Sequence, residues 1–487
     1  MSEKPNILWL TVDHQAFANH YDFQPQFARK LKTFERLRRE GRFYDQAYTS
    51  CPLCTPARAS MLSGRYPSNH RLMLNPDAED CECRTSFDSA EELFAQAMTK
   101  QGYRVAQIGK WHVGDKIPEE LGFEGWSSPG YGKPYISEEY REYLTSHSLP
   151  EPKVKLLWDA FNPELAGQEF VLTGEYQPFC ATRELVSPKE THEAYFVSNM
   201  ACNWLTQYAQ AEADKPFVLK VDVWGPHHPY DTAPPFKGMI SPSELLQHPS
   251  FGESTEGKPS VYAHAGSTWR QLANISWAQM SELLSVCYEH AILVDDALGR
   301  ILNVLDELGL ASSTVVVMTS DHGDILGAHG KLFNKENLLV EETTKVPLVI
   351  RWPKQIEAGE VCSDLVSNMD IPATVLAFGG AVAGHKLDGF DLLGTHKREQ
   401  LMCQAFGCYK REFEQRMLRW GKYKFIAHNN DIDELYDLER DSFELTNLSS
   451  AYEYQQIVAE MQMRLLTEME HACDNTFATA LKDKWMT

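Results

Sequence analysis

Hydrophobic residues along this chain gather into short runs that end abruptly in polar residues. The clearest runs, rich in β-branched and aromatic residues, cover positions 6–12, 103–108, 216–223 and 314–320. Segments with the period of an amphipathic helix lie between them, such as residues 277–308. Strands that alternate with helices in this way predict an α/β fold with a mainly parallel sheet.

The residues that directly follow these runs are rich in acids, histidine and lysine. They read Asp13-His14, Gly109-Lys110-Trp111-His112, Trp224-Gly225-Pro226-His227-His228 and Asp321-His322-Gly323-Asp324. Parallel sheets bind ligands beyond the carboxyl ends of their strands. The pattern therefore predicts that these side chains meet at one edge of the sheet and form an active site.

Asp13, Asp321 and His322 have the chemistry of divalent-metal ligands. Carboxylate oxygens suit a hard cation such as Ca²⁺ or Mg²⁺, and an imidazole also permits Mn²⁺ or Zn²⁺. Each residue alone has a simpler interpretation, because an Asp after a strand is commonly a helix N-cap and Asp-His-Gly can form an ordinary turn. Their joint position after two strands, together with a candidate nucleophile, favours a metal site.

The segment that begins at Cys54 reads Cys-Thr-Pro-Ala-Arg-Ala-Ser-Met-Leu-Ser-Gly-Arg and predicts a short helix. Thr55 is a good N-cap, Pro56 suits the first helical position, and Gly64 marks the end. Cys54 is then expected at a helix N-terminus, where free N–H groups favour an anion, with the cation of Arg58 one turn further on. By itself the segment also fits a buried structural cysteine beside a surface arginine.

The pattern C-x-P-x-R at Cys54 resembles the sulfatase signature, and several later segments resemble other sulfatase motifs. The later segments are 102–112, Pro226-His227 with Pro229, Asp321-His322-Gly323-Asp324, His329-Gly330, Lys335, Val346-Pro347-Leu348, and 434–438 with Asn447-Leu448. The chain thus resembles the formylglycine-dependent, type I sulfatases of the alkaline phosphatase superfamily over nearly its whole length. The resemblance implies an alkaline-phosphatase-like α/β/α sandwich with a small C-terminal domain of antiparallel sheet and helix.

The same resemblance implies that Cys54 is oxidised to formylglycine, and a formylglycine-generating enzyme is the expected maturation partner. The residues expected to balance the charge on the sulfuryl oxygens are Arg58, Lys110 and Lys335. His227, with Lys335, would assist the leaving oxygen. His112 would take a proton from the second hydroxyl of the hydrated aldehyde.

The resemblance also places residue 54 at the metal. The implied ligands of one divalent ion are Asp13, Cys54, Asp321 and His322, with Ca²⁺ expected first and Mg²⁺ or Mn²⁺ as alternatives. The chain departs from many sulfatases at His14, where a second Asp is common, and at His322, where Asn is common. The Asp-His form is similar to choline sulfatases and to phosphonate monoester hydrolases. The alternative function is therefore a phosphonate monoester hydrolase or phosphodiesterase, and a catalytically silent binding protein is a weaker third hypothesis.

The motif-bearing strands predict a catalytic domain over residues 1–375 and a C-terminal subdomain over residues 376–487. Within the subdomain, residues 400–406, 416–420 and 423–428 are predicted to form antiparallel strands, and residues 452–469 a helix. Residues 133–189 are polar and Pro-rich without clear periodicity, which predicts an active-site loop region. His228 and His329 lie in turn-rich sequence and are interpreted as solvated or hydrogen-bonded loop residues.

A net charge of −22 argues against nucleic acid or an anionic membrane as a partner. It also offers no steering to a densely sulfated polymer, so the expected substrate is a small sulfate ester or a short sulfated saccharide. The first apolar run is too short for a signal peptide, and no stretch reaches transmembrane length. The eleven cysteines are interpreted as reduced thiols. We therefore expect a cytoplasmic enzyme and leave a homo-oligomer open.

Overall fold

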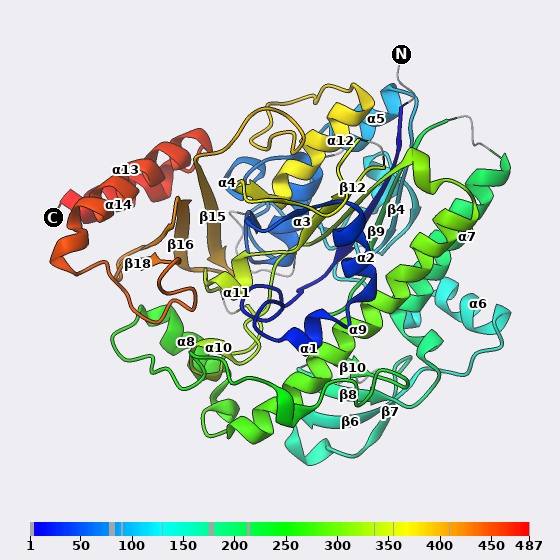
Figure 1. Ribbon diagram of the computed structural model, residues 1–487, viewed down its shortest axis with the longest axis horizontal. Helices are drawn as coiled ribbons and strands as arrows, with labels where there is room; N and C mark the ends of the chain where they lie inside the picture. The colour runs from blue at the N-terminus through cyan, green and yellow to red at the C-terminus, as the bar shows by residue number, and fades with distance from the viewer. Residues whose placement is uncertain are drawn as a thin grey trace.

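The computed structural model describes residues 4–76, 83–88, 91–128, 130–174, 180–211, 215–335, 337–353, 355–408 and 410–486, without the side chain of Arg270. A large sheet lies at the centre of the molecule (Figure 1). Its strands are β1 (Asn6–Val12), β2 (Arg42–Tyr44), β4 (Arg104–Gly109), β5 (Glu124–Trp126), β9 (Phe217–Asp222), β11 (Thr314–Ser320), β12 (Leu348–Arg351) and β13 (Glu360–Cys362). They follow the spatial order β13-β2-β12-β11-β1-β9-β4-β5.

The central part of this sheet is parallel, as predicted. β1 pairs in parallel with β11 and β9, and β4 pairs in parallel with β9 and β5, whereas β12 runs antiparallel to β11 and β2. In register, Thr11 lies opposite both Thr319 and Asp222. The carboxyl ends of β1, β9 and β11 are therefore level with one another, and the residues that follow them start from the same edge.

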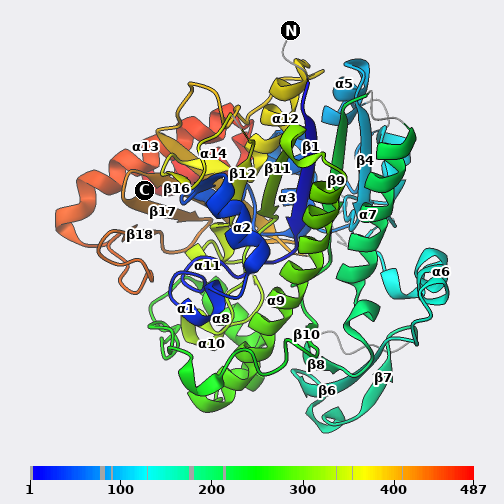
Figure 2. The ribbon, with the colours of Figure 1, turned by 45° about the vertical axis from the view of Figure 1, so that its right-hand side comes forward.

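Helices cover both faces of the sheet (Figure 2). Leu8 and Leu10 of β1 belong to a core shared with α2 (Lys32–Glu40), α7 (Glu193–Ala211) and α9 (Trp277–Glu307). Ile7 and Trp9, on the opposite face, belong to a core shared with α3 (Cys54–Ser63), α5 (Phe94–Lys100) and α12 (Ile371–Gly379). Because successive side chains of a strand point to opposite faces, an entirely apolar strand needs cover on both. The α/β/α sandwich is confirmed.

A second, antiparallel sheet lies at the C-terminal end of the chain. It consists of β15 (Gln400–Gly407), β16 (Arg411–Trp420), β17 (Tyr423–His428) and β18 (Glu434–Asp437), and α13 (Gln455–His471) and α14 (Asn475–Met486) contribute to its core. The antiparallel strands and α13 were predicted, and β18 and α14 were not. The domain division at residue 375 stays a prediction. In the structure, that position lies inside α12.

Residues 133–189 contain more regular structure than predicted. They include α6 (Glu138–Ser146), β6 (Lys153–Asp159), β7 (Glu169–Val171) and β8 (Ala181–Leu185), and the three strands form a small sheet with β10 (Tyr230–Thr232). β6 begins with an alternation of exposed lysines and buried apolar residues, a signal too short to stand out among polar sequence. Residues 175–179 of this segment lie outside the described residues.

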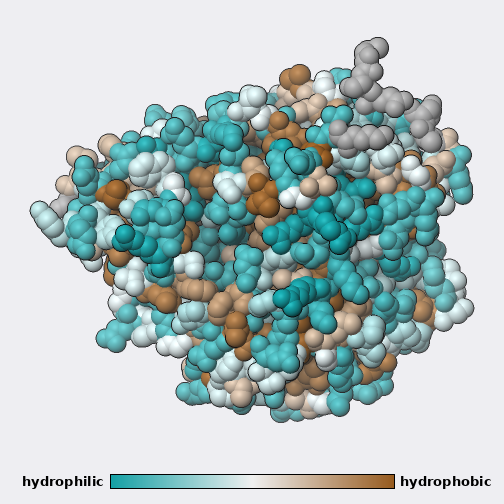
Figure 3. Space-filling model, in the orientation of Figure 1, coloured by the Kyte–Doolittle hydropathy of each residue, from teal (hydrophilic) through white to brown (hydrophobic). Residues whose placement is uncertain are grey.

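Short elements connect the larger ones: α1 (Pro25–Ala28), α4 (Pro67–His70), α8 (Ser260–Thr268), α10 (Ala328–Lys331), α11 (Glu341–Thr344), β3 (Ala47–Tyr48) and β14 (Val366–Ser367). Among the described helices, none is both long enough and apolar enough to cross a membrane. Hydrophilic residues predominate on the face shown in Figure 3, with small hydrophobic patches between them. Seven of the described cysteines are free thiols, in agreement with the interpretation from the sequence: Cys51, Cys54, Cys202, Cys287, Cys362, Cys403 and Cys473.

Candidate active site

Cys54 is the first residue of α3 and is 1% exposed. The N-cap is Leu53, whose backbone is extended, so the prediction that Thr55 caps the helix was wrong. The Thr55 hydroxyl is used elsewhere, because it donates a hydrogen bond of 2.7 Å to the carbonyl oxygen of His112. Gly64 ends the helix with a φ of 67°, as predicted. The expected position of Cys54 at a helix N-terminus is therefore confirmed.

Four buried residues bring potential metal ligands together at this point. One ligand atom from each of Asp13, Cys54, Asp321 and His322 lies within 4.8 Å of the others. The Cys54 Sγ atom is 3.2 Å from Nε2 of His322 and 3.8 Å from Oδ1 of Asp13. The group combines the ends of β1 and β11 with the start of α3.

The chemistry of these donors fits a divalent cation. The Nδ1 atom of His322 lies 3.0 Å from the carbonyl oxygen of Gly323, so the ring proton belongs on Nδ1 and the lone pair of Nε2 faces the group. Two carboxylates suit a hard cation, and the imidazole widens the choice to Mn²⁺ or Zn²⁺.

Arg58 is buried among three carboxylates. Its Nε donates to Oδ2 of Asp321 at 3.0 Å, Nη1 to Oδ1 of Asp222 at 3.1 Å, and Nη2 to Oδ2 of Asp13 at 3.3 Å. Burial would by itself lower the pKa of the guanidinium, but the three carboxylates raise it. Arg58 therefore fixes the carboxylates of Asp13 and Asp321 in position.

Asp222 is a residue that the sequence analysis missed. It ends β9, is fully buried, and accepts hydrogen bonds from Arg58 at 3.1 Å and from Nε2 of Gln107 at 2.8 Å. Lys220, on the same strand, also pairs with its carboxylate. The available signal was two charged residues in an otherwise apolar strand, since a central strand of a parallel sheet accepts a charge only when it is paired.

Lys110 brings a second cation to Asp13. Its ammonium group pairs with the Asp13 carboxylate and lies 4.2 Å from the centre of the Tyr131 ring. Burial would by itself raise the pKa of Asp13, but Lys110 and Arg58 hold it well below its ordinary value. Asp13 is therefore an ionised carboxylate at neutral pH.

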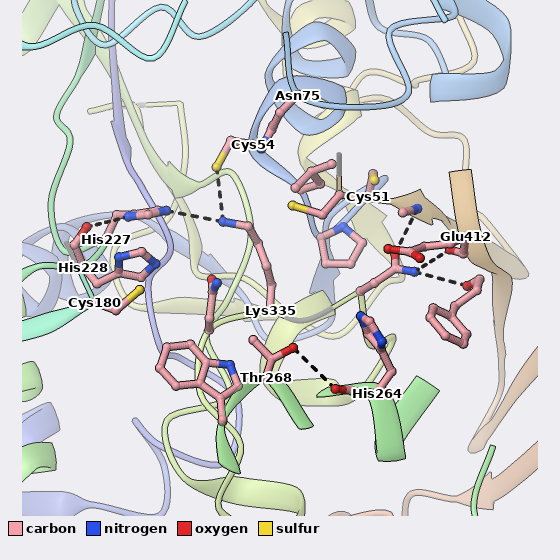
Figure 4. A pocket seen from close by; sticks show the side chains of 18 of the residues that line it. Cys51, Cys54, Asn75, Cys180, His227, His228, His264, Thr268, Lys335 and Glu412 are labelled. Atoms are coloured by element: carbon pink, nitrogen blue, oxygen red, sulfur yellow. Dashed lines mark hydrogen bonds between the residues drawn. The ribbon is translucent and has the colours of Figure 1, made fainter. Parts of the chain in front are cut away.

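Lys335 lies on the other side of Cys54. Its Nζ atom is 3.5 Å from the Cys54 Sγ atom and 3.4 Å from Nε2 of His227 (Figure 4). The Nδ1 atom of His227 lies 2.7 Å from the carbonyl oxygen of His228, an arrangement that leaves Nε2 to face Lys335. Burial would raise the pKa of the Cys54 thiol, as would Asp13, but Lys335, Lys110 and His322 bring it below its ordinary value.

A cavity of about 570 Å³ opens from this point. Of the predicted catalytic residues, Cys54, His112, His227 and Lys335 line it. Arg58 and Lys110 do not line it and lie behind, against the carboxylates. The structure thus separates residues that face the cavity from residues that hold the carboxylates of the metal-capable group.

Three further histidines are buried near this region. His14 has a φ of 64°, and its ring centre lies 4.7 Å from that of His322 and 4.8 Å from that of His227, yet it is not part of the metal-capable group. His228 is 3% exposed and His329 is 1% exposed, so neither is solvated, whereas the alternative of a hydrogen-bonded residue holds for His329. Turn-rich sequence does not reveal that a loop folds beneath other parts of the chain.

His329 belongs to a buried network of ion pairs near the C-terminal sheet. Its Nε2 lies 2.9 Å from Oε2 of Glu342, and its Nδ1 lies 3.3 Å from Oε2 of Glu253. Lys424 of β17 pairs with Oε1 of Glu444 at 2.8 Å in the same region. A second metal-capable group consists of His329, Glu342 and Glu444. One potential ligand atom from each lies within 4.8 Å of the others. We interpret this network as structural, because its carboxylates already have cationic partners.

His329→Gln is expected to lower the free energy of unfolding by about 3 kcal/mol, because it leaves buried Glu342 without this cation. Burial alone would lower the pKa of His329, but Glu342 and Glu253 raise it to about 9 from 6.5. The stabilisation is therefore complete below about pH 6.5 and is lost as the pH rises through about 9. Denaturant unfolding of both proteins from about pH 6 to about pH 10 measures the difference, and a constant difference over this range would contradict the prediction.

A buried group of metal-capable residues at the strand ends of an α/β/α sandwich, beside a cavity that contains Lys335, is typical of hydrolases that act on anionic esters. A family model described as Sulfatase matches residues 5–381. A second model, described as N-sulphoglucosamine sulphohydrolase, C-terminal, matches residues 327–471. The first match covers more than half of the chain, so the chain belongs to the sulfatase family and is by class a sulfuric ester hydrolase.

Several named sulfatases are similar to this chain along most of its length. An ulvan-active sulfatase of Formosa agariphila is 25% identical over 481 residues, which cover 95% of this chain and 80% of that protein. An N-acetylglucosamine-6-O-sulfatase of Bacteroides thetaiotaomicron is 23% identical, and the match covers 96% of this chain and 87% of that protein. A choline-sulfatase of Rhizobium meliloti is 27% identical, and the match covers 92% of this chain and 82% of that protein.

Solved structures share the fold. A protein in complex with its substrate, D-glucosamine-2-N,6-O-disulfate, superimposes with a TM-score of 0.71 at 20% identity and covers 97% of this chain and 99% of that one. The phosphonate monoester hydrolase of Agrobacterium radiobacter superimposes with a TM-score of 0.72 at 20% identity and covers 96% of each chain. Both likenesses support the alkaline-phosphatase-like architecture.

Proposed function

We propose that this sulfatase hydrolyses a small sulfate ester or a short sulfated saccharide, with formylglycine derived from Cys54 as the nucleophile. The observation that carries the proposal is the position of Cys54 Sγ between the metal-capable group and the Lys335–His227 pair. A formylglycine-generating enzyme is the maturation partner that this chemistry requires. Seven free thiols among the described cysteines support a reducing compartment, which we propose is the cytoplasm.

The metal-capable group would hold one divalent cation, with Ca²⁺ as our first choice because two of its donors are carboxylates. When bound, such a cation supplies positive charge that lowers the pKa of a hydroxyl and neutralises the sulfuryl oxygens. The residues that would hold it are Asp13, Asp321, His322 and the modified residue 54. Arg58 keeps two of these carboxylates in place through hydrogen bonds to Asp321 and Asp13.

The residues that face the cavity would move the protons. Lys335 and His227 lie on one side of residue 54, where they can stabilise and protonate the leaving alcohol oxygen. His112 would accept a proton from the second hydroxyl of the hydrated aldehyde. Burial and nearby Lys110 lower the pKa of His112 well below its ordinary value, so its imidazole is neutral and able to accept that proton at neutral pH.

The proposal predicts that kcat/KM for a monosulfated monosaccharide exceeds the values for a long sulfated polymer and for an aryl phosphonate. The net charge of −22 repels a polyanion, whereas the cavity of about 570 Å³ has room for one or two sugar rings. Side-by-side assays at two salt concentrations make the comparison. A faster reaction with the polymer that weakens as salt rises would contradict the substrate size, and a faster reaction with the phosphonate would contradict the sulfatase activity.

A further inference from the structure

The cavity extends well beyond the reacting group at residue 54. Its inner end is formed by Cys54, His227 and Lys335. Its outer end is lined by Phe161, His264, Trp269, Glu412 and Phe413, which come from three separate parts of the chain. Figure 4 shows Glu412 and His264 on the opposite side of the cavity from His227 and His228. This outer end is where the alcohol part of a bound sulfate ester would lie.

The outer end has a strained and tightly held backbone at Phe413. Its φ is 49°, a conformation that a bulky side chain rarely adopts and that structures retain mostly at functional positions. Nδ2 of Asn337 donates to the carbonyl oxygens of Glu412 at 3.1 Å and of Phe413 at 3.2 Å. Nε2 of Gln415 donates to the same Phe413 oxygen at 3.0 Å. Asn337 lies two residues after Lys335, so this rim is tied directly to the segment that carries the leaving-group lysine.

Aromatic rings line the same end of the cavity as Glu412. The ring centres of His264 and Phe413 are 4.8 Å apart, and those of Phe161 and Trp269 are 6.2 Å apart. Among the described residues that line the cavity, Glu412 is the one carboxylate and Lys335 is the one lysine or arginine. A partly buried carboxylate in a cavity lined by aromatic rings is a suitable environment for a cation.

The negative charge of Glu412 is only weakly compensated by the neighbouring lysine. The ammonium group of Lys410 lies 3.1 Å from its Oε2 atom, but the Lys410 side chain is 69% exposed. Ion pairs with such exposed partners are weak, because water and salt screen them. The Glu412 side chain is itself only 28% exposed, so a ligand that covers it would interact in a less screened environment.

We propose that the outer end of the cavity binds a positively charged nitrogen on the alcohol part of the substrate, with Glu412 as its counter-ion and Phe413 as a ring face against it. This inference rests on the proposed sulfatase function and narrows it to the sulfate ester of an amino alcohol. Such an ester is a zwitterion without net charge, so the −22 charge of the protein does not repel it. An ammonium group on an amino sugar and a quaternary ammonium group share the required chemistry.

The test compares two matched pairs of substrates. Glucosamine 6-sulfate, at a pH where its amine is protonated, is paired with glucose 6-sulfate, and choline sulfate is paired with its neutral carbon analogue, 3,3-dimethylbutyl sulfate. We expect kcat/KM for the cationic member to exceed that of the neutral member about tenfold in at least one pair. The pair with the larger ratio identifies the source of the nitrogen. A ratio near one in both pairs would overturn the inference.

Variants assign the preference to the rim. Glu412→Gln is expected to lower the ratio of cationic to neutral kcat/KM about tenfold, to a value near one. Phe413→Leu is expected to lower the wild-type ratio of the quaternary ammonium pair. Glu399→Gln, which removes a carboxylate that is 83% exposed and does not line the cavity, is the matched charge control and should keep the wild-type ratio. A ratio that Glu412→Gln does not change would overturn the assignment.

These outcomes are distinct from failure of the proposed function. If protein that carries the aldehyde at position 54 hydrolyses no sulfate ester at all, both proposals are wrong. If it hydrolyses cationic and neutral esters equally, the sulfatase function stands and the inference about Glu412 fails.

Discussion

Cys54→Ala is expected to reduce kcat/KM for an aryl sulfate by at least about 10⁴-fold. The loss follows from the position of Cys54, whose Sγ atom is the point where the metal-capable group, Lys335 and the inner end of the cavity meet. Alanine provides neither the hydroxyl that attacks sulfur nor the second hydroxyl that allows the enzyme to turn over again. Steady-state kinetics of purified variant and wild type measure the effect.

The matched control is Cys473→Ala, which removes an exposed free cysteine at the other end of the chain and should leave activity unchanged. Mass spectrometry of the wild-type peptide that contains position 54 should show an aldehyde in place of the thiol. Wild-type protein that turns over fully with an unmodified thiol at this position would refute the assignment. The wild type has to be produced together with its maturation enzyme, because an unmodified preparation would be inactive for a different reason.

Asp321→Asn is expected to lose the divalent metal and to reduce kcat by about 10³-fold or more, because a bound cation contributes several kcal/mol to the transition state. Asp321 supplies one of the four grouped ligand atoms and is also held by Nε of Arg58 at 3.0 Å. The amide removes the negative charge while it keeps the shape. Metal content per chain and kcat, measured on the same preparation, check both parts.

Asp324→Asn is the control for this substitution within the same segment. Asp324 accepts a hydrogen bond of 2.5 Å from the hydroxyl of Tyr230 and is not part of the metal-capable group. Burial raises the pKa of Asp324 to about 6, so loss of its charge is a small change near that pH. This variant should bind metal as the wild type does. Full activity and one metal per chain in Asp321→Asn would show that the ligands have been assigned incorrectly.

The sequence predicts the layout of the active site because the layout depends on local patterns. An apolar strand followed by polar residues places Asp13 and Asp321 at one edge of a parallel sheet, and a helix start places Cys54 beside them. These features need only the period of the hydrophobic residues and the rule that parallel strands end together. Contacts between segments that are distant in the sequence then set the distances between these three residues.

Residues that act through tertiary contacts were not predictable in this way. In the sequence, Asp222 resembles any other residue of its strand. Its role becomes visible only in its hydrogen bond of 3.1 Å with Arg58, which is distant in the sequence. Glu412 and Phe413 enter the cavity only because β16 packs near the loop that carries Asn337. The burial of His329 was not predictable for the same reason, because its partners Glu342 and Glu253 are not its neighbours in the sequence.

The proposed oxidation of Cys54, together with the burial of this residue, has a consequence for the biosynthesis of the enzyme. In the folded chain this residue is 1% exposed and the helix that begins with it is buried along its whole length. A second enzyme that oxidises the thiol needs the surrounding segment in an accessible form, so it has to act before α3 packs against the sheet. Modification and folding therefore compete in time, and each chain that folds first is lost to catalysis. The active fraction of a preparation is then set by the ratio of two rates, and slower synthesis or more modifying enzyme raises it without any change in the amino-acid sequence.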